Sequence, residues 1–202
     1  MYEKNCILLI DICEPGESSS IIEYLKSINN DVHVVIANYG LALWCHANDE
    51  EPEYQKLIKS SQIVPGKLVR GTFTYFGLVN MPNNLKIMDY LKIKNFKVSY
   101  FTEAAEFIQF VKLNSFTSIT LMGAAWHMCL HNRPLGINHL PQLLPKDVKF
   151  LTHPVGCVPY NLDVSNCVPV EEQIKTDKDW IKFNENGTLW EYIKYKPTTA
   201  SN

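Results

Sequence analysis

The chain contains very little arginine and almost no net charge. Only two of its 202 residues are arginine, Arg70 and Arg133, and the formal net charge at pH 7 is −2. A protein without excess positive charge has no general attraction for a polyanion. We therefore expect no nucleic-acid partner.

Long apolar runs are also lacking. The N-terminal apolar stretch 6–12 is much shorter than the roughly 18 residues that a membrane-spanning helix needs. It has acidic residues on both sides and no small-residue cleavage site of the kind that ends a signal peptide. We expect a soluble, cytoplasmic protein with no membrane partner.

Several common binding motifs are missing as well. The six cysteines are irregularly spaced and form no C-x-x-C pair, so thiols are expected rather than disulfides. The chain has no phosphate-binding loop, no dinucleotide-binding glycine motif and no G-x-S-x-G turn. His127 and His131 are spaced to share a helix face, but no second ligand pair accompanies them. We expect neither a cofactor nor a metal.

Buried strands alternating with helical stretches predict the fold. Short apolar runs bounded by turn residues are typical of parallel strands buried on both faces, and intervening apolar residues at helical spacing predict the crossovers. We predict an α/β fold, a three-layer α/β/α sandwich with a mostly parallel central sheet. The predicted strands are Cys6–Asp11, Val32–Ala37, Lys97–Phe101, Ser118–Gly123 and Val148–Thr152, the last ended by His153 and Pro154.

The C-terminal part has a different character. It is rich in proline, and the Asn186–Gly187 turn between two β-prone aromatic runs predicts a hairpin. We predict a core domain over residues 1–153 and a hairpin-containing extension over 154–202. An isolated hairpin is not stable, so the extension should pack on the core or on a second subunit, which would make the protein a homo-oligomer.

Polar residues at the carboxyl ends of the predicted strands are the candidate site, because open parallel sheets bind ligands there. Asp11 ends a fully apolar strand, where an unpaired carboxylate would be costly. It could act as a general base, or its side chain could simply make a hydrogen bond to the following loop. Cys129 is expected one turn into a helix, whose dipole would favour a nucleophilic thiolate; the alternative is a simple buried thiol. The predicted catalytic residues are Asp11, Cys129 and His127, and the predicted substrate-binding residues are Asn38, Tyr39, Glu103 and Trp126.

This arrangement resembles the isochorismatase-like cysteine hydrolases over roughly residues 6–152. The run ILLID supplies Asp11, and Gly123 and Cys129 have the spacing of the family's Gly-x-x-x-x-x-Cys nucleophile turn. The resemblance implies an α/β/α sandwich with an Asp, a Lys and a Cys in the active site. Ser99 and Tyr100 stand where the family has its Lys, so either His127 replaces the cation or no group does.

Three functions follow from these residues. The first is hydrolysis of an amide or related carbonyl of a small molecule by Cys129, with Asp11 moving the proton. The second is a catalytically degenerate relative that binds a small ligand or a protein partner. The third is a Mg²⁺-dependent phosphate-processing enzyme that uses Asp11, Glu14 and Glu103.

Overall fold

The structure is a computed structural model, and it describes only part of the chain. The described residues are 4–12, 17–37, 81–101, 104–123, 126, 129–158, 168–183 and 188–194. Five residues of the candidate sites lie outside these ranges: Glu14, Asn38, Tyr39, Glu103 and His127.

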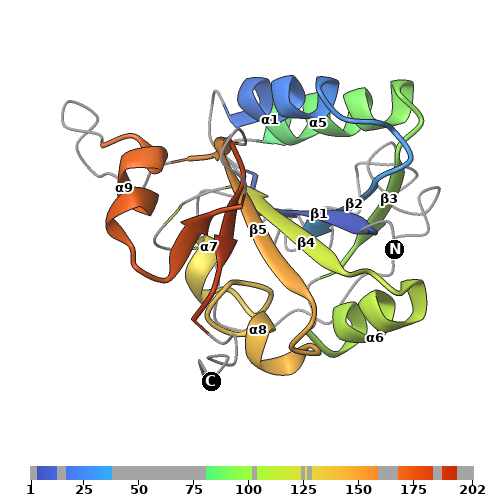
Figure 1. The fold of residues 1–202 in the computed structure, drawn as a ribbon. Helices are drawn as coiled ribbons and strands as arrows, with labels where there is room; N and C mark the ends of the chain where they lie inside the picture. The colour runs from blue at the N-terminus through green and yellow to red at the C-terminus, as the bar shows by residue number, and fades with distance from the viewer. Residues whose placement is uncertain are drawn as a thin grey trace, which may run out of the picture.

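A seven-stranded, mostly parallel sheet forms the centre of the molecule (Figure 1). Its strands, in the order β3-β2-β1-β4-β5-β7-β6, are β1 (Asn5–Ile10), β2 (His33–Ala37), β3 (Lys97–Tyr100), β4 (Ser118–Gly123), β5 (Lys149–Cys157), β6 (Trp180–Lys182) and β7 (Trp190–Tyr192). The strands from β1 to β5 pair in parallel, whereas β7 pairs antiparallel with both β5 and β6. The α/β class and the mostly parallel sheet are confirmed.

Helices lie on both faces of this sheet. They are α1 (Glu17–Lys26), α5 (Met81–Ile93), α6 (Ala104–Asn114), α7 (Cys129–Asn132), α8 (Leu140–Leu143) and α9 (Val170–Thr176). In Figure 1, α1 and α5 lie together above the sheet, and α6 and α8 lie below it. None of the helices in the described ranges has the length and apolarity needed to cross a membrane.

Side chains of β1 point alternately to the two faces of the sheet, so the core consists of two clusters. Ile7 and Leu9 face one side, where they pack with α1 and α5. Cys6, Leu8 and Ile10 face the other side. We call the first side the aliphatic face: Ile7, Leu9, Ile12, Ile21, Leu25, Val34, Ile36, Ile87, Leu91 and Met122. The second is the aromatic face, whose buried aromatic residues are Phe101, Phe107, Phe116, Trp126, Phe150, Trp180, Trp190 and Tyr192.

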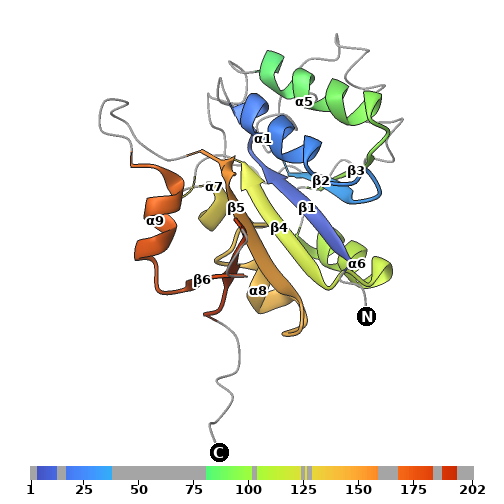
Figure 2. The ribbon, with the colours of Figure 1, turned by 45° about the horizontal axis from the view of Figure 1, so that its top comes forward.

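The predicted C-terminal hairpin is confirmed, and it continues the main sheet. Strands β6 and β7 pair antiparallel, and β7 pairs with β5. Their side chains Trp180, Trp190 and Tyr192 enter the aromatic face, so the residues after 154 share one core with those before it. Figure 2 shows α9 and β6 on the side of the molecule away from β3.

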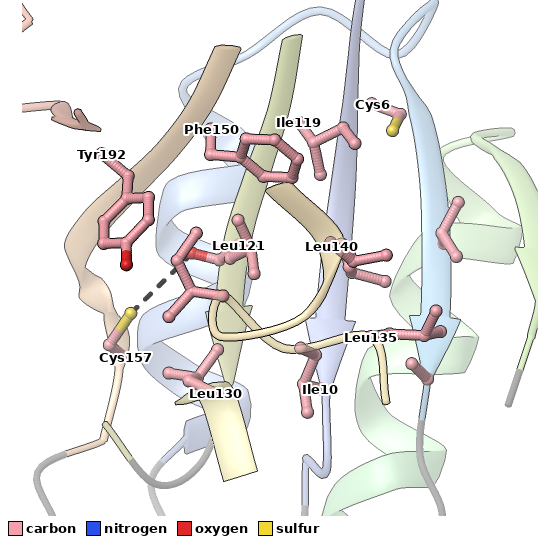
Figure 3. Packing of buried hydrophobic residues seen from close by; sticks show 14 of the residues in the cluster. Cys6, Ile10, Ile119, Leu121, Leu130, Leu135, Leu140, Phe150, Cys157 and Tyr192 are labelled. Carbon is pink, nitrogen blue, oxygen red and sulfur yellow. Dashed lines mark hydrogen bonds between the residues drawn. The ribbon is translucent and has the colours of Figure 1, made fainter. Parts of the chain in front are cut away.

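The predicted end of β5 at Thr152 is wrong, because the strand continues through Pro154 to Cys157. Proline removes a ladder hydrogen bond and usually stops a strand unless a bulge accommodates it. Here Thr152 pairs with Leu121 and Cys157 pairs with Gly123, so a register shift on β5 takes up the extra residues. The side chain of Cys157 lies close to the Thr152 hydroxyl, at 3.2 Å, and points toward the carbonyl of Leu121 (Figure 3).

Candidate functional site

The candidate site lies where the strand order reverses. After β1 the chain builds β2 and β3 on one side and then crosses to build β4 and β5 on the other. The carboxyl ends of β1 and β4 are therefore adjacent, with Ile10 paired to Gly123. This switch point is where open α/β sheets bind their ligands. Asp11 follows β1 directly, as predicted.

The backbone at these two strand ends is tightly constrained. Gly123 has φ +124°, and a Cβ at this position would overlap the carbonyl oxygen of Ile10. Only glycine allows so close an approach of two backbones. Asp11 has φ +45°, in the left-handed region that aspartate tolerates better than most residues, while its N–H donates to the carbonyl of Ala37 at 3.2 Å. Both features turn the chain sharply at the top of the sheet.

A buried ion pair joins Asp11 to Arg133. The Nε of Arg133 donates to Oδ2 of Asp11 at 2.5 Å, and the side chains are 10% and 4% exposed. The two residues are 122 positions apart in the sequence. A carboxylate so thoroughly removed from water needs a partner charge, and this guanidinium supplies it. The partner of the Asp11 side chain is thus a charged side chain, and a role of this carboxylate in a site stays a prediction.

Arg133 also contacts the side chain of Cys129. Burial lowers the pKa of Arg133, but the charges of Asp11 and Cys129 and hydrogen bonds to both side chains raise it by more. The pKa of the guanidinium therefore lies above its ordinary value. One permanent cation thus lies next to both a carboxylate and a half-buried thiol.

Helical geometry explains why Cys129 and Arg133 point the same way. They are four residues apart, and the N–H of Arg133 donates to the carbonyl of Cys129 at 3.1 Å, as in one helical turn. The prediction that Cys129 lies one turn into its helix is wrong, because it is the first residue of α7. Since α7 has only four residues, its dipole is small, and the cation near the thiol is a side chain.

Sequence reasoning overlooked Arg133. It allowed for His127 or no cation in place of the family's Lys, but the structure brings Arg133 to Asp11 and Cys129. A signal was available, since Arg133 is one of only two arginines and follows Cys129 by a helical turn. Lys97 begins β3, at the amino-terminal ends of the strands, which lie opposite the candidate site.

Apolar packing holds α7 against the end of β1. Leu130, Leu135 and Ile10 belong to the same cluster of the aromatic face and are each almost fully buried. In Figure 3 the side chains of Leu130 and Leu135 are seen on either side of Ile10, the residue before Asp11. The carbonyl of Leu130 accepts from the N–H of Ile137 at 2.9 Å, which folds the following loop back on the helix.

The other predicted site residues are distributed differently. Trp126 is 1% exposed and packs against the rings of His131 and Trp180, so its side chain belongs to the core, and its contact with a substrate stays a prediction. Asn38, Tyr39, Glu103 and His127 lie outside the described residues and also stay predictions. Within the described ranges no three His, Cys, Asp or Glu side chains are grouped as metal ligands.

Comparison with known proteins identifies no protein similar to this chain. Scans of protein-family models, curated proteins and solved structures each return no significant match to this chain. The function is therefore inferred from the geometry of the site and from its chemistry.

Proposed function

We propose that Asp11, Arg133 and Cys129 form the active site of a cysteine hydrolase of the isochorismatase-like type. Its substrate would be an amide or related carbonyl compound of low molecular weight. The observation that carries the proposal is the buried Asp11–Arg133 ion pair beside Cys129, at the switch point of the sheet. A reactive thiol needs a reducing compartment, so the proposal includes a cytoplasmic location.

The chemistry needs one nucleophile, one proton carrier and one cation. Asp11 takes the proton of the Cys129 thiol, and the sulfur attacks the carbonyl carbon of the substrate. The carbon–nitrogen bond breaks, and the amine leaves with the proton that Asp11 carries. Water then attacks the thioester, Asp11 accepts a proton from that water, and the acid product leaves. Asp11 returns the proton to the sulfur.

Arg133 takes the role that a lysine has in the family. A guanidinium remains charged at every physiological pH and can bind two groups at once through its planar fork. Here it can hold Asp11 in place while stabilising the thiolate of Cys129. A lysine at the same position would offer a compact ammonium in place of the planar fork, so it would contact the two groups with a different geometry.

Thiol alkylation tests the proposal without knowledge of the substrate. The protein is treated with a small amount of iodoacetamide, and the modified cysteine is identified by intact mass and peptide mapping. We expect Cys129 to react first, and Cys6 and Cys157 serve as internal controls because both are buried. Arg133→Met should slow the reaction of Cys129 about tenfold or more, since the thiolate loses its cation. Equal, slow alkylation of Cys129 and the other five cysteines would argue against a catalytic cysteine.

A degenerate binding protein is the second candidate, and one observation favours it. The carboxylate of Asp11 already accepts a charged hydrogen bond at 2.5 Å from Arg133, and a carboxylate so paired is a weaker base. In that case Asp11 and Arg133 would keep a structural ion pair without turnover. Screening small amides with the wild type and Cys129→Ala separates the two: hydrolysis lost in Cys129→Ala supports the enzyme.

A further inference from the structure

An aromatic stack links the C-terminal hairpin to α7. The indole of Trp126 lies between two other rings: that of Trp180 in β6, at 5.2 Å between centroids, and that of His131 in α7, at 5.1 Å. The His131 contact is edge-to-face, with an interplanar angle of 80°. Trp180 in turn contacts Tyr192 of β7 at 5.1 Å. Rings at these distances and angles attract one another beyond the area that they bury.

The position of His131 within α7 gives this stack its significance. Residues four apart share one helix face, so Cys129 and Arg133 point the same way, toward Asp11. Residue 131 is rotated by about 200° from Cys129 and by as much from Arg133, so it lies on the opposite side of the helix. Trp126 therefore contacts the side of α7 away from Asp11.

The backbone around Trp126 is anchored to the sheet as well. Its N–H donates to the carbonyl of Val158 at 2.8 Å, and the N–H of Val158 donates to the carbonyl of Gly123 at 3.0 Å. These bonds tie the connection between β4 and α7 to the end of β5. Such anchoring matters because α7 has four residues and is too short to be stable on its own.

We propose that Trp126 and Trp180 are positioning residues, which hold α7 so that Arg133 reaches both Asp11 and Cys129. The C-terminal hairpin is then part of the architecture of the site, although none of its residues is assigned a chemical role. The inference rests on the proposed function only where reactivity is measured. The position of Arg133 can be measured independently.

Trp180→Ala is the principal test, with Trp190→Ala as a matched control. Both remove a buried tryptophan from the same hairpin, but Trp190 packs under the ammonium of Lys182, at 5.7 Å, on the neighbouring strand. The first readout is the Nε–H signal of Arg133 in a ¹H–¹⁵N NMR spectrum. The chain has only two arginines, so Arg133→Lys identifies the signal by its loss.

We expect Trp180→Ala to shift or broaden the Arg133 signal and Trp190→Ala to leave it in place. In the second readout, the alkylation rate of Cys129 at neutral pH should fall about tenfold in Trp180→Ala, with the midpoint of its pH profile moved upward. Trp180→Phe keeps a ring and should restore most of both readouts. If Trp180→Ala does not fold, Trp180→Leu takes its place, because leucine removes the ring contacts with Trp126 and Tyr192 but still fills part of the volume.

The outcomes separate the two proposals. If folded Trp180→Ala leaves the Arg133 signal unchanged, or if Trp190→Ala moves it equally, the positioning role is wrong. If wild-type Cys129 is no more reactive than Cys6 and Cys157, the proposed hydrolase fails. The NMR comparison still decides whether the stack positions Arg133.

Discussion

The two faces of the sheet are built in different ways. The core of the aliphatic face comes from four elements in the first half of the chain, β1, α1, β2 and α5, together with Ile12 and Met122. The aromatic face gathers side chains from Cys6 to Tyr192 and includes the hairpin at the other end of the described chain. The aliphatic face covers one side of the sheet with α1 and α5, whereas the aromatic face packs against α7, which lies next to the Asp11–Arg133 ion pair.

The largest expected effect is at the glycine where the two faces meet. Gly123→Ala places a Cβ against the backbone of Ile10 and forces a φ of +124° on an L-residue. Neither strand end can move without disturbing the sheet, so we expect a loss of more than about 4 kcal/mol in the free energy of unfolding. Urea denaturation measures it.

Gly156→Ala is the control for this loss. Its added Cβ meets the side chain of Met122 on the aliphatic face, and that flexible thioether can move aside. We expect a loss of about 1–2 kcal/mol. A similar loss in both variants would show that the close approach of β4 to β1 is not the limiting constraint.

The second prediction removes the ion pair next to α7. Arg133→Met leaves the buried carboxylate of Asp11 without its guanidinium, and we expect the free energy of unfolding to fall by about 3–4 kcal/mol. Chemical denaturation at pH 7 measures the change. The double variant Asp11→Asn, Arg133→Met should recover much of the loss, because neither charge remains buried.

Lys175→Met is the matched exposed case. Lys175 pairs with Glu172 at 2.6 Å, but both side chains are largely in water, so we expect almost no change in stability. An equally large loss there would mean that burial is not what makes the Asp11–Arg133 pair important.

The third prediction compares packing on the two faces directly. Phe107 contacts the rings of Phe101 and Phe110, with centroids at 5.9 and 6.3 Å, so Phe107→Leu loses ring contacts as well as volume. We expect it to lower the free energy of unfolding by about 1.5–2.5 kcal/mol. Ile87→Val on the aliphatic face removes one methylene and should cost about 1 kcal/mol. Thermal unfolding measures both losses. A larger loss in Ile87→Val than in Phe107→Leu would contradict the idea that ring contacts stabilise the aromatic face.

The smallest effect concerns His33, at the amino-terminal end of the aromatic face. Burial, with help from the charges of Lys97 and Lys4, lowers the pKa of His33 to about 4. The folded protein therefore resists a proton that the unfolded chain accepts near pH 6.5. Stability should fall as the pH drops from about 6.5 to about 4, by about 1 kcal/mol because the ring is partly exposed to solvent.

His33→Gln provides the comparison for this pH dependence. Glutamine can still bond the Ser99 hydroxyl, which lies 2.8 Å from Nε2 of His33, but it does not titrate. We expect its stability to vary less between pH 6.5 and 4 than that of the wild type. If urea denaturation gave the same dependence of stability on pH for the wild type and His33→Gln, His33 would not be the cause of that dependence.

Much of the scaffold was predictable, because its signals are local. The apolar runs of β1, β2 and β4 are specified by neighbouring residues, and the antiparallel pairing of β6 with β7 was predicted from the short stretch of sequence that joins them. The continuation of β5 through Pro154 was not predictable, since it depends on a register shift against β4. Asp11 and Cys129 could be proposed as site residues because each follows a readable strand.

The sequence by itself determined the parallel strands, the crossovers, the place of Asp11 directly after β1 and that of Cys129 in the helix that follows β4. Hydrophobic periodicity and turn residues act over a few neighbouring positions, so a short stretch of sequence is enough to predict these elements. Only the tertiary structure decided that Arg133 pairs with Asp11 and that Trp180 packs against Trp126. Those contacts join residues more than 50 positions apart, and they form only when the sheet brings its distant segments together.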